Sequence, residues 1–112
     1  MIEQIRPAEL DDWLHRQPGA RPVMLDVREP WEVQTACVQG SNFELVTIPM
    51  AAIPARLVEL EKDRPTACLC HLGGRSMQVA IFLEHHGFTR VANIAGGTHA
   101  WSLERDPDLP IY

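Results

Sequence analysis

The sequence lacks several features that would each indicate a particular class of protein. No apolar run approaches the ~20 residues of a transmembrane helix, and the first residues lack the basic and apolar regions of a signal peptide. Lysine and arginine (10) are fewer than aspartate and glutamate (15), so the net charge is −5, whereas binding to nucleic acid needs clustered positive charge. We therefore expect a cytoplasmic protein with neither a membrane nor a nucleic acid as its partner.

Cysteine is also scarce. Three cysteines are an odd number, and in a chain without signs of export they do not suggest a disulfide framework. Cys68 and Cys70 are two positions apart, so on a strand they share a face, but a bridge between such close neighbours would be strained. We expect reduced thiols or a catalytic thiol, and we interpret Cys68 as a packing residue.

What is present is typical of a single domain. The chain has 112 residues, of which 46% are hydrophobic and 22% charged, without repeats, linkers or low-complexity segments. A chain of this length buries about two-thirds of the surface that its unfolded form exposes, which is enough for one core. We predict one domain over residues 1–112.

Short apolar runs alternate with stretches of helical periodicity. We predict strands at 2–5, 22–28, 45–48, 66–70 and 91–94, and helices that begin near residues 7 and 30, cover 54–62 and 76–86, and follow 96–97. In the helix at 54–62, Leu57, Val58 and Leu60 are expected to be buried. This alternation predicts an α/β domain with a five-stranded, mainly parallel sheet and helices on both faces. Ligands of such sheets bind at the carboxyl ends of the strands.

The residues after the fourth predicted strand carry the chemistry. Cys70 ends the strand, and Ser76 starts a helix a few residues later. Gly73 and Gly74 allow the backbone between them to curl, so that successive N–H groups form a nest for an anion. With the positive end of the helix, these donors are expected to favour the thiolate of Cys70. Arg75 is placed either to pair with an oxyanion of the substrate or to brace the loop.

The same residues can also be interpreted as having purely structural roles. Cys70 on its own would be a buried strand cysteine beside a plain turn, since free cysteine is often buried, and Ser76 would be only an N-cap. The glycine pair, the arginine and the helix start at compatible spacing favour the catalytic interpretation. Asp26 and Arg28, at another strand end, are expected to support neighbouring loops through hydrogen bonds rather than to bind substrate.

Four segments resemble one known family, the single-domain rhodaneses, which are sulfurtransferases. The segments follow the family's order over the whole chain, and they are Leu25-Asp26-Val27-Arg28-Glu29, Ile48-Pro49, Cys70-His-Leu-Gly-Gly-Arg-Ser76 and Gly96-Gly97-Thr98-His99-Ala100-Trp101. Trp101 and Trp31 are expected to be packing residues. The sequence departs from the family's pattern at one place, where Cys37 replaces a usual histidine and residues 42–47 lengthen the segment before Ile48.

The resemblance implies a two-step transfer of a sulfane sulfur. Cys70 attacks the outer sulfur of thiosulfate or of a persulfide donor and becomes a persulfide. An acceptor then removes the outer sulfur from this persulfide. His71, Leu72, Gly73, Gly74 and Arg75 form the substrate-binding loop, with Arg75 and His71 facing the anionic end of the donor. The acceptor is cyanide in an assay, and a small thiol or a thioredoxin-like protein in the cell. No metal and no other cofactor is required.

Two alternatives remain open. The first is a persulfide carrier or interaction module that loads sulfur but turns over only with a protein partner. The second is a cysteine phosphatase, because phosphatases of related fold also place an arginine after a cysteine loop. Those loops have five residues between the cysteine and the arginine, whereas Cys70 and Arg75 are separated by four. The smaller loop suits a sulfur atom better than a phosphoryl group, and no aspartic acid in the loop serves as general acid.

Overall fold

One parallel sheet forms the centre of the molecule. The computed structural model describes residues 2–19 and 21–112, and in these residues five strands lie in the order β1-β5-β4-β2-β3. The strands are β1 (Glu3–Ile5), β2 (Val23–Asp26), β3 (Glu44–Thr47), β4 (Thr66–Leu69) and β5 (Val91–Ile94). All pairs are parallel, and Leu25 of β2 lies in register with Cys68 of β4 and Val46 of β3. The predicted α/β class and five-stranded sheet are confirmed.

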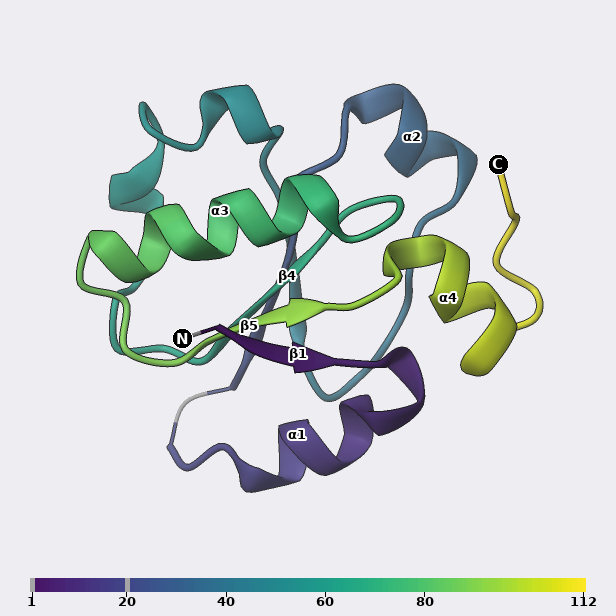
Figure 1. Ribbon diagram of the computed structural model, residues 1–112, viewed down its shortest axis with the longest axis horizontal. Helices are drawn as coiled ribbons and strands as arrows, with labels where there is room; N and C mark the ends of the chain where they lie inside the picture. Colours follow the sequence, from purple (N-terminus) through teal and green to yellow (C-terminus); the bar gives the residue numbers. More distant parts are fainter. Residues whose placement is uncertain (1, 20) are drawn as a thin grey trace.

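Helices cover both faces of the sheet, as predicted (Figure 1). The α-helices are α1 (Leu10–Arg16), α2 (Pro30–Thr35), α3 (Gly74–His85) and α4 (Gly97–Glu104), and the short 3₁₀ helices are η1 (Pro7–Glu9), η2 (Met50–Ala52) and η3 (Leu57–Glu59). Figure 1 shows α1 and α3 on opposite sides of the sheet. None of the helices in the described part of the chain has both the length and the hydropathy that a membrane crossing requires.

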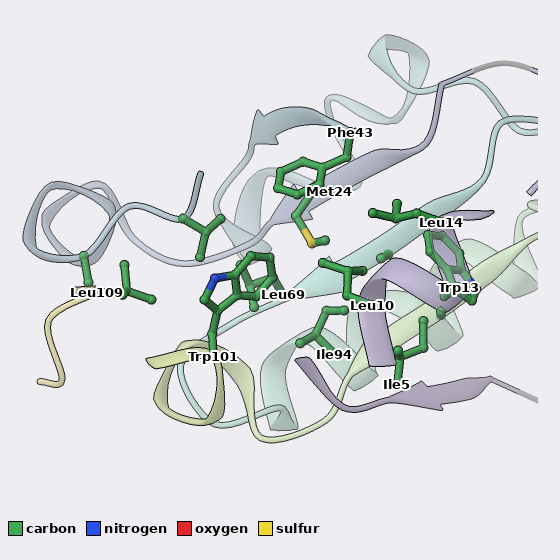
Figure 2. Close-up of a cluster of buried hydrophobic side chains, with 14 residues drawn as sticks. Ile5, Leu10, Trp13, Leu14, Met24, Phe43, Leu69, Ile94, Trp101 and Leu109 are labelled. Carbon is green, nitrogen blue, oxygen red and sulfur yellow. The ribbon is translucent and has the colours of Figure 1, made fainter. Parts of the chain in front are cut away.

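The alternation of side chains along the central strands divides the core in two. Met24 and Leu69 point toward α1 and α4, where they pack with Leu10, Trp13 and Trp101 (Figure 2). The neighbouring positions Leu25, Cys68 and Cys70 point to the other face and pack with Val79 and Leu83 of α3. Both faces of β2 and β4 are therefore buried, which explains why their sequences are apolar without polar alternation.

The predicted helix at 54–62 is wrong. The structure has turns there and a single 3₁₀ turn, η3, with Val58 93% exposed and only Leu60 buried among the three residues expected in the core. Leu57 and Leu60 are three positions apart, which matches the period of a 3₁₀ turn, where side chains i and i+3 eclipse. Val58 lies off this line and faces water. The other predicted elements are present with ends that differ by up to three residues.

Candidate active site at the Cys70 loop

Cys70 directly follows β4, which lies in the middle of the sheet between β2 and β5. It is 1% exposed, its sulfur atom accepts a hydrogen bond from the backbone N–H of Gly73 at 3.1 Å, and the sulfur lies 3.2 Å from the hydroxyl oxygen of Ser76. The loop between Cys70 and α3 is short, so the sulfur also lies beside the amino terminus of a 12-residue helix. A backbone donor and the positive end of a helix dipole thus meet at one thiol.

Gly73 gives the loop its tight curl. It adopts a left-handed conformation (φ +105°), and a Cβ atom there would lie 3.2 Å from the backbone nitrogen of Gly96. The left-handed backbone angle therefore favours glycine at this position, and the tight contact adds to that preference. Gly74, which we expected to act in the same way, is the first residue of α3, is not left-handed and has open space where a Cβ would be.

The amino terminus of α4 holds the other side of the loop. The backbone N–H of Thr98 donates to the carbonyl oxygen of Cys70 at 2.9 Å, and that of His99 donates to the carbonyl oxygen of His71 at 3.2 Å. Gly97 makes this approach possible, because a Cβ on Gly97 would lie under 3.0 Å from both carbonyl oxygens. The second glycine motif is thus the packing partner of the cysteine loop.

Ser76 does not cap α3, since Gly73 occupies the N-cap position. Its hydroxyl is buried and lies 3.2 Å from the sulfur of Cys70, 2.6 Å from Oδ1 of Asn93 and 3.3 Å from the carbonyl oxygen of Gly73. Asn93 in turn donates to Gln4 and to the carbonyl of Gly73. Sequence reasoning missed Asn93, although a polar residue inside an apolar strand was a usable signal.

Arg75 is held by a partner that we did not predict. Its guanidinium donates two hydrogen bonds of 2.7 Å to the two carboxylate oxygens of Glu32 on α2. The arrangement corresponds to the bracing role that the sequence left open for Arg75, and substrate binding by Arg75 stays a prediction. The Arg75 guanidinium is also the largest influence on Glu32, and it lowers the pKa of that carboxyl from 4.5 to about 2. Glu32 is an acidic residue in the first turn of a short helix, and this position alone does not predict an ion pair with Arg75.

Asp26 and Arg28 form a second, fully buried ion pair. Two nitrogens of the Arg28 guanidinium donate to the Asp26 carboxylate at 2.7–3.2 Å, and Arg28 also donates to the carbonyl oxygens of Ala36 at 2.7 Å and of Glu32 at 3.3 Å. These bonds connect the end of β2 to both ends of α2. The geometry fits the predicted supporting role, which substitutions remain to test.

Aromatic side chains surround the mouth of the loop. The imidazole of His71 stacks on the ring of Tyr112 with a centroid distance of 4.0 Å, and Trp31 meets the same ring edge-on at 6.0 Å. Trp31 is 62% exposed, so its predicted packing role is wrong, whereas Trp101 is 1% exposed and packs as predicted. Leu72, in the loop itself, is 63% exposed. Sequence reasoning missed Tyr112, because the contact spans 41 positions of the chain.

The other two thiols differ sharply in environment. Cys68 is fully buried beneath α3, and burial raises the pKa of its thiol well above the ordinary value. The raised pKa disfavours the reactive thiolate of Cys68, which agrees with the predicted packing role. Cys37, in the segment that departs from the expected pattern, is exposed.

Both the sequence and the fold are similar to those of known proteins. Residues 6–104 match the family described as Rhodanese-like domain. Rhodanese-like/PpiC domain-containing protein 12 of Arabidopsis thaliana, a chloroplastic protein, is 43% identical over 90 residues, which make up 80% of this chain and 30% of that protein. A sulfurtransferase of Allochromatium vinosum is 36% identical over 80 residues, or 71% of each chain. The crystal structure of a rhodanese-like domain protein from Staphylococcus aureus has a TM-score of 0.75 and 29% identity, with 99% of both chains covered.

Proposed function

The chain belongs to the rhodanese-like domain family, and we propose that it is a sulfurtransferase in which Cys70 carries the transferred sulfur as a persulfide. Transfer of sulfur in general is supported by the family and by the sulfurtransferase among its relatives. The single observation that supports Cys70 as the carrier is the convergence of the Gly73 N–H and the amino terminus of α3 on its sulfur, beside the Ser76 hydroxyl.

In the first step the Cys70 thiolate attacks the outer sulfur of the donor. A sulfur–sulfur bond forms to Cys70, the bond between that outer sulfur and the rest of the donor breaks, and its electron pair leaves with sulfite or with a thiolate. The new terminal sulfur carries the negative charge that the thiolate carried before. The loop N–H groups and the positive end of α3 stabilise this charge in both states.

In the second step a nucleophilic acceptor removes the terminal sulfur. A thiolate or cyanide attacks it, the sulfur–sulfur bond to Cys70 breaks, and Cys70 recovers its electron pair as the thiolate. The first step takes Cys70 from the thiol to the persulfide level and the second step returns it, so the complete cycle leaves the protein unchanged and requires neither a metal nor an organic cofactor. The outer sulfur adds little volume beyond the thiol, which suits a loop with four residues between Cys70 and Arg75.

Intact-mass spectrometry tests the proposal. The wild-type protein is mixed with thiosulfate and, separately, with a small organic persulfide, and we expect a gain of about 32 Da from the extra sulfur. Cys70→Ser should show no gain with either donor, whereas Cys37→Ser should still show it. A wild-type protein that gains no mass from either donor would refute sulfur transfer through Cys70.

Turnover distinguishes an enzyme from a carrier. If the loaded protein loses the extra sulfur when cyanide or a small dithiol is added, and can be loaded again, it is an enzyme. A loaded form that persists in the presence of these acceptors, and that loses its sulfur only to a protein thiol, would instead support the carrier. We expect release to the small dithiol within the time of an ordinary assay.

A further inference from the structure

The arginine that follows the cysteine loop is paired within the protein itself. Arg75 is separated from Cys70 by four residues, and its pKa is raised first by the hydrogen bonds to Glu32 and to a smaller extent by the nearby Cys70, so Arg75 is a candidate partner for a negatively charged donor. Its guanidinium nevertheless donates both of its short hydrogen bonds to Glu32. A dianion such as thiosulfate therefore meets an ion pair with no net charge, and gains little electrostatic attraction from it.

Glu32 is fixed in place from three directions. Besides the two bonds from Arg75, its carboxylate accepts a hydrogen bond from the backbone N–H of Glu29 at 3.0 Å and one from the Tyr112 hydroxyl at 2.8 Å. The Tyr112 hydroxyl itself accepts a hydrogen bond from Arg28 at 3.1 Å. The side chain of Glu32 is 5% exposed. The Arg75 side chain is 34% exposed, but an anion that took over the two N–H groups bonded to Glu32 would have to displace a buried carboxylate with four hydrogen bonds.

The surface beside the ion pair is apolar instead. Trp31 meets Tyr112 edge-on, Tyr112 stacks on His71 of the loop, and Leu72 belongs to the loop itself; we call Trp31, Tyr112 and Leu72 the rim, and Trp31 and Leu72 are more than 60% exposed. Thiosulfate has no carbon and gains nothing from such a rim. An organic persulfide has a carbon-bearing group next to its sulfur atoms, and that group would cover exposed apolar surface while its outer sulfur reaches Cys70.

We propose that Glu32, by keeping Arg75 occupied, together with the Trp31–Tyr112–Leu72 rim, makes this site selective for organic persulfides over thiosulfate. This inference rests on the proposed function. In the selected reaction the Cys70 thiolate attacks the outer sulfur of R–S–S–H, the bond between the two donor sulfurs breaks, and R–S⁻ leaves with the electron pair and takes up the proton that the outer sulfur carried. The terminal sulfur passes to Cys70, which becomes the persulfide anion Cys–S–S⁻ and keeps the negative charge of the thiolate.

The test compares kcat/KM for the two donors in the wild-type protein and in Glu32→Gln. Glutamine keeps the size of the side chain but releases Arg75, so kcat/KM for thiosulfate should rise about 10-fold or more, the worth of a hydrogen bond to a charged group. The gain should shrink at high salt, which screens the attraction to the freed guanidinium. Use of the organic persulfide should stay within about threefold of wild type, since that donor does not depend on Arg75.

Glu59→Gln is the matched control, because it breaks an arginine–glutamate pair of the same kind on the surface, between Arg56 and Glu59. Glu59→Gln should leave kcat/KM unchanged for both donors. Trp31→Ala should lower kcat/KM for the organic persulfide about fivefold and leave thiosulfate unchanged. Circular dichroism confirms that each variant is folded. If Glu32→Gln does not fold, Tyr112→Phe serves instead, since it keeps the ring and removes one bond to Glu32, and it should shift the donor ratio in the same direction.

The outcomes separate the two proposals. Failure of either donor to load Cys70 would refute sulfur transfer itself. Loading from both donors with equal efficiency in the wild type, or a Glu32→Gln variant with an unchanged donor ratio and salt dependence, would overturn the selectivity while leaving sulfur transfer intact. A rise in thiosulfate use in Glu59→Gln as large as that in Glu32→Gln would also overturn it, because the effect would then follow net charge and not the release of Arg75.

Discussion

The ion pair between Glu32 and Arg75 should make the stability of the fold depend on pH in a calculable way. The pKa of Glu32 is lowered from 4.5 to about 2, first by the hydrogen bonds from Arg75 and further by those from Glu29 and Tyr112, against the opposing effect of burial. A folded-state pKa below the unfolded value means that the folded protein holds the proton less tightly. The pair therefore contributes stability that is complete above about pH 4.5 and is lost as the pH falls toward 2.

The magnitude follows from the size of the change. Each pKa unit is worth ~1.36 kcal/mol, so a fall from 4.5 to about 2 corresponds to about 3 kcal/mol. The Glu32 side chain is 5% exposed, but that of Arg75 is 34% exposed, and water near the guanidinium screens part of the interaction. We therefore expect about 2 kcal/mol in the free energy of unfolding.

The measurement is urea unfolding of the wild type and of Glu32→Gln between about pH 7 and pH 2.5, followed by circular dichroism. The difference in free energy of unfolding between the two proteins should be about 2 kcal/mol larger at pH 7 than at the acidic end, with the change below about pH 4.5. The other carboxylates are the same in both proteins, so their contribution cancels in the difference between the two free energies of unfolding. For Glu59→Gln, whose ion pair is exposed at both residues, the difference in free energy of unfolding from wild type should not change with pH in this way. A gap between wild type and Glu32→Gln that is constant with pH would refute the reasoning.

Three further outcomes are expected. In urea unfolding, Gly97→Ala should lower the free energy of unfolding by ~3 kcal/mol or more, because its Cβ would overlap two carbonyl oxygens of the cysteine loop. Gly74→Ala, where a Cβ has open space, should leave the free energy of unfolding unchanged or raise it by up to ~1 kcal/mol. Trp101→Ala should cost ~3–5 kcal/mol by the same measurement, and Trp31→Ala under ~0.5 kcal/mol, because only the first ring is buried; equal costs would contradict the exposures. Ser76→Ala should slow loading of the thiol with sulfur about 10-fold in time-resolved mass spectra, because it removes the hydroxyl that lies beside the sulfur and bonds to Asn93, and an unchanged rate would exclude that role.

The sequence predicts the sheet and the cysteine loop because both depend on local patterns. Apolar runs and glycine-containing turns show where β2, β4 and β5 lie, and the spacing from Cys70 to Ser76 shows a loop that ends in a helix. The turn at 54–62 was misassigned for the same reason, because two apolar residues three apart fit an α-helix and a 3₁₀ turn equally well. Local pattern cannot decide between these, and packing against the sheet does.

The side chains around the loop could not be predicted, since they come from distant parts of the chain. Glu32 reaches Arg75 across 43 positions, and Tyr112 reaches Glu32 across 80. Nothing in the local sequence distinguishes these residues from ordinary surface side chains. Trp31 is the converse case, because a tryptophan is expected in the core and here lies on the rim of the site. The sequence therefore indicates the reactive atom, while donor choice depends on contacts that only the fold brings together.

The two glycine motifs illustrate how the loop and α4 depend on each other. Gly73 packs against the backbone of Gly96, and Gly97 allows the N–H groups of Thr98 and His99 to reach the carbonyls of Cys70 and His71. The carbonyls of Cys70 and His71 are thus held by α4, while the N–H of Gly73 donates to the sulfur. A substitution in either motif should therefore disturb the orientation of the Gly73 N–H. The motif after β5 is as much a part of the reactive site as the loop after β4, and it acts there through its backbone.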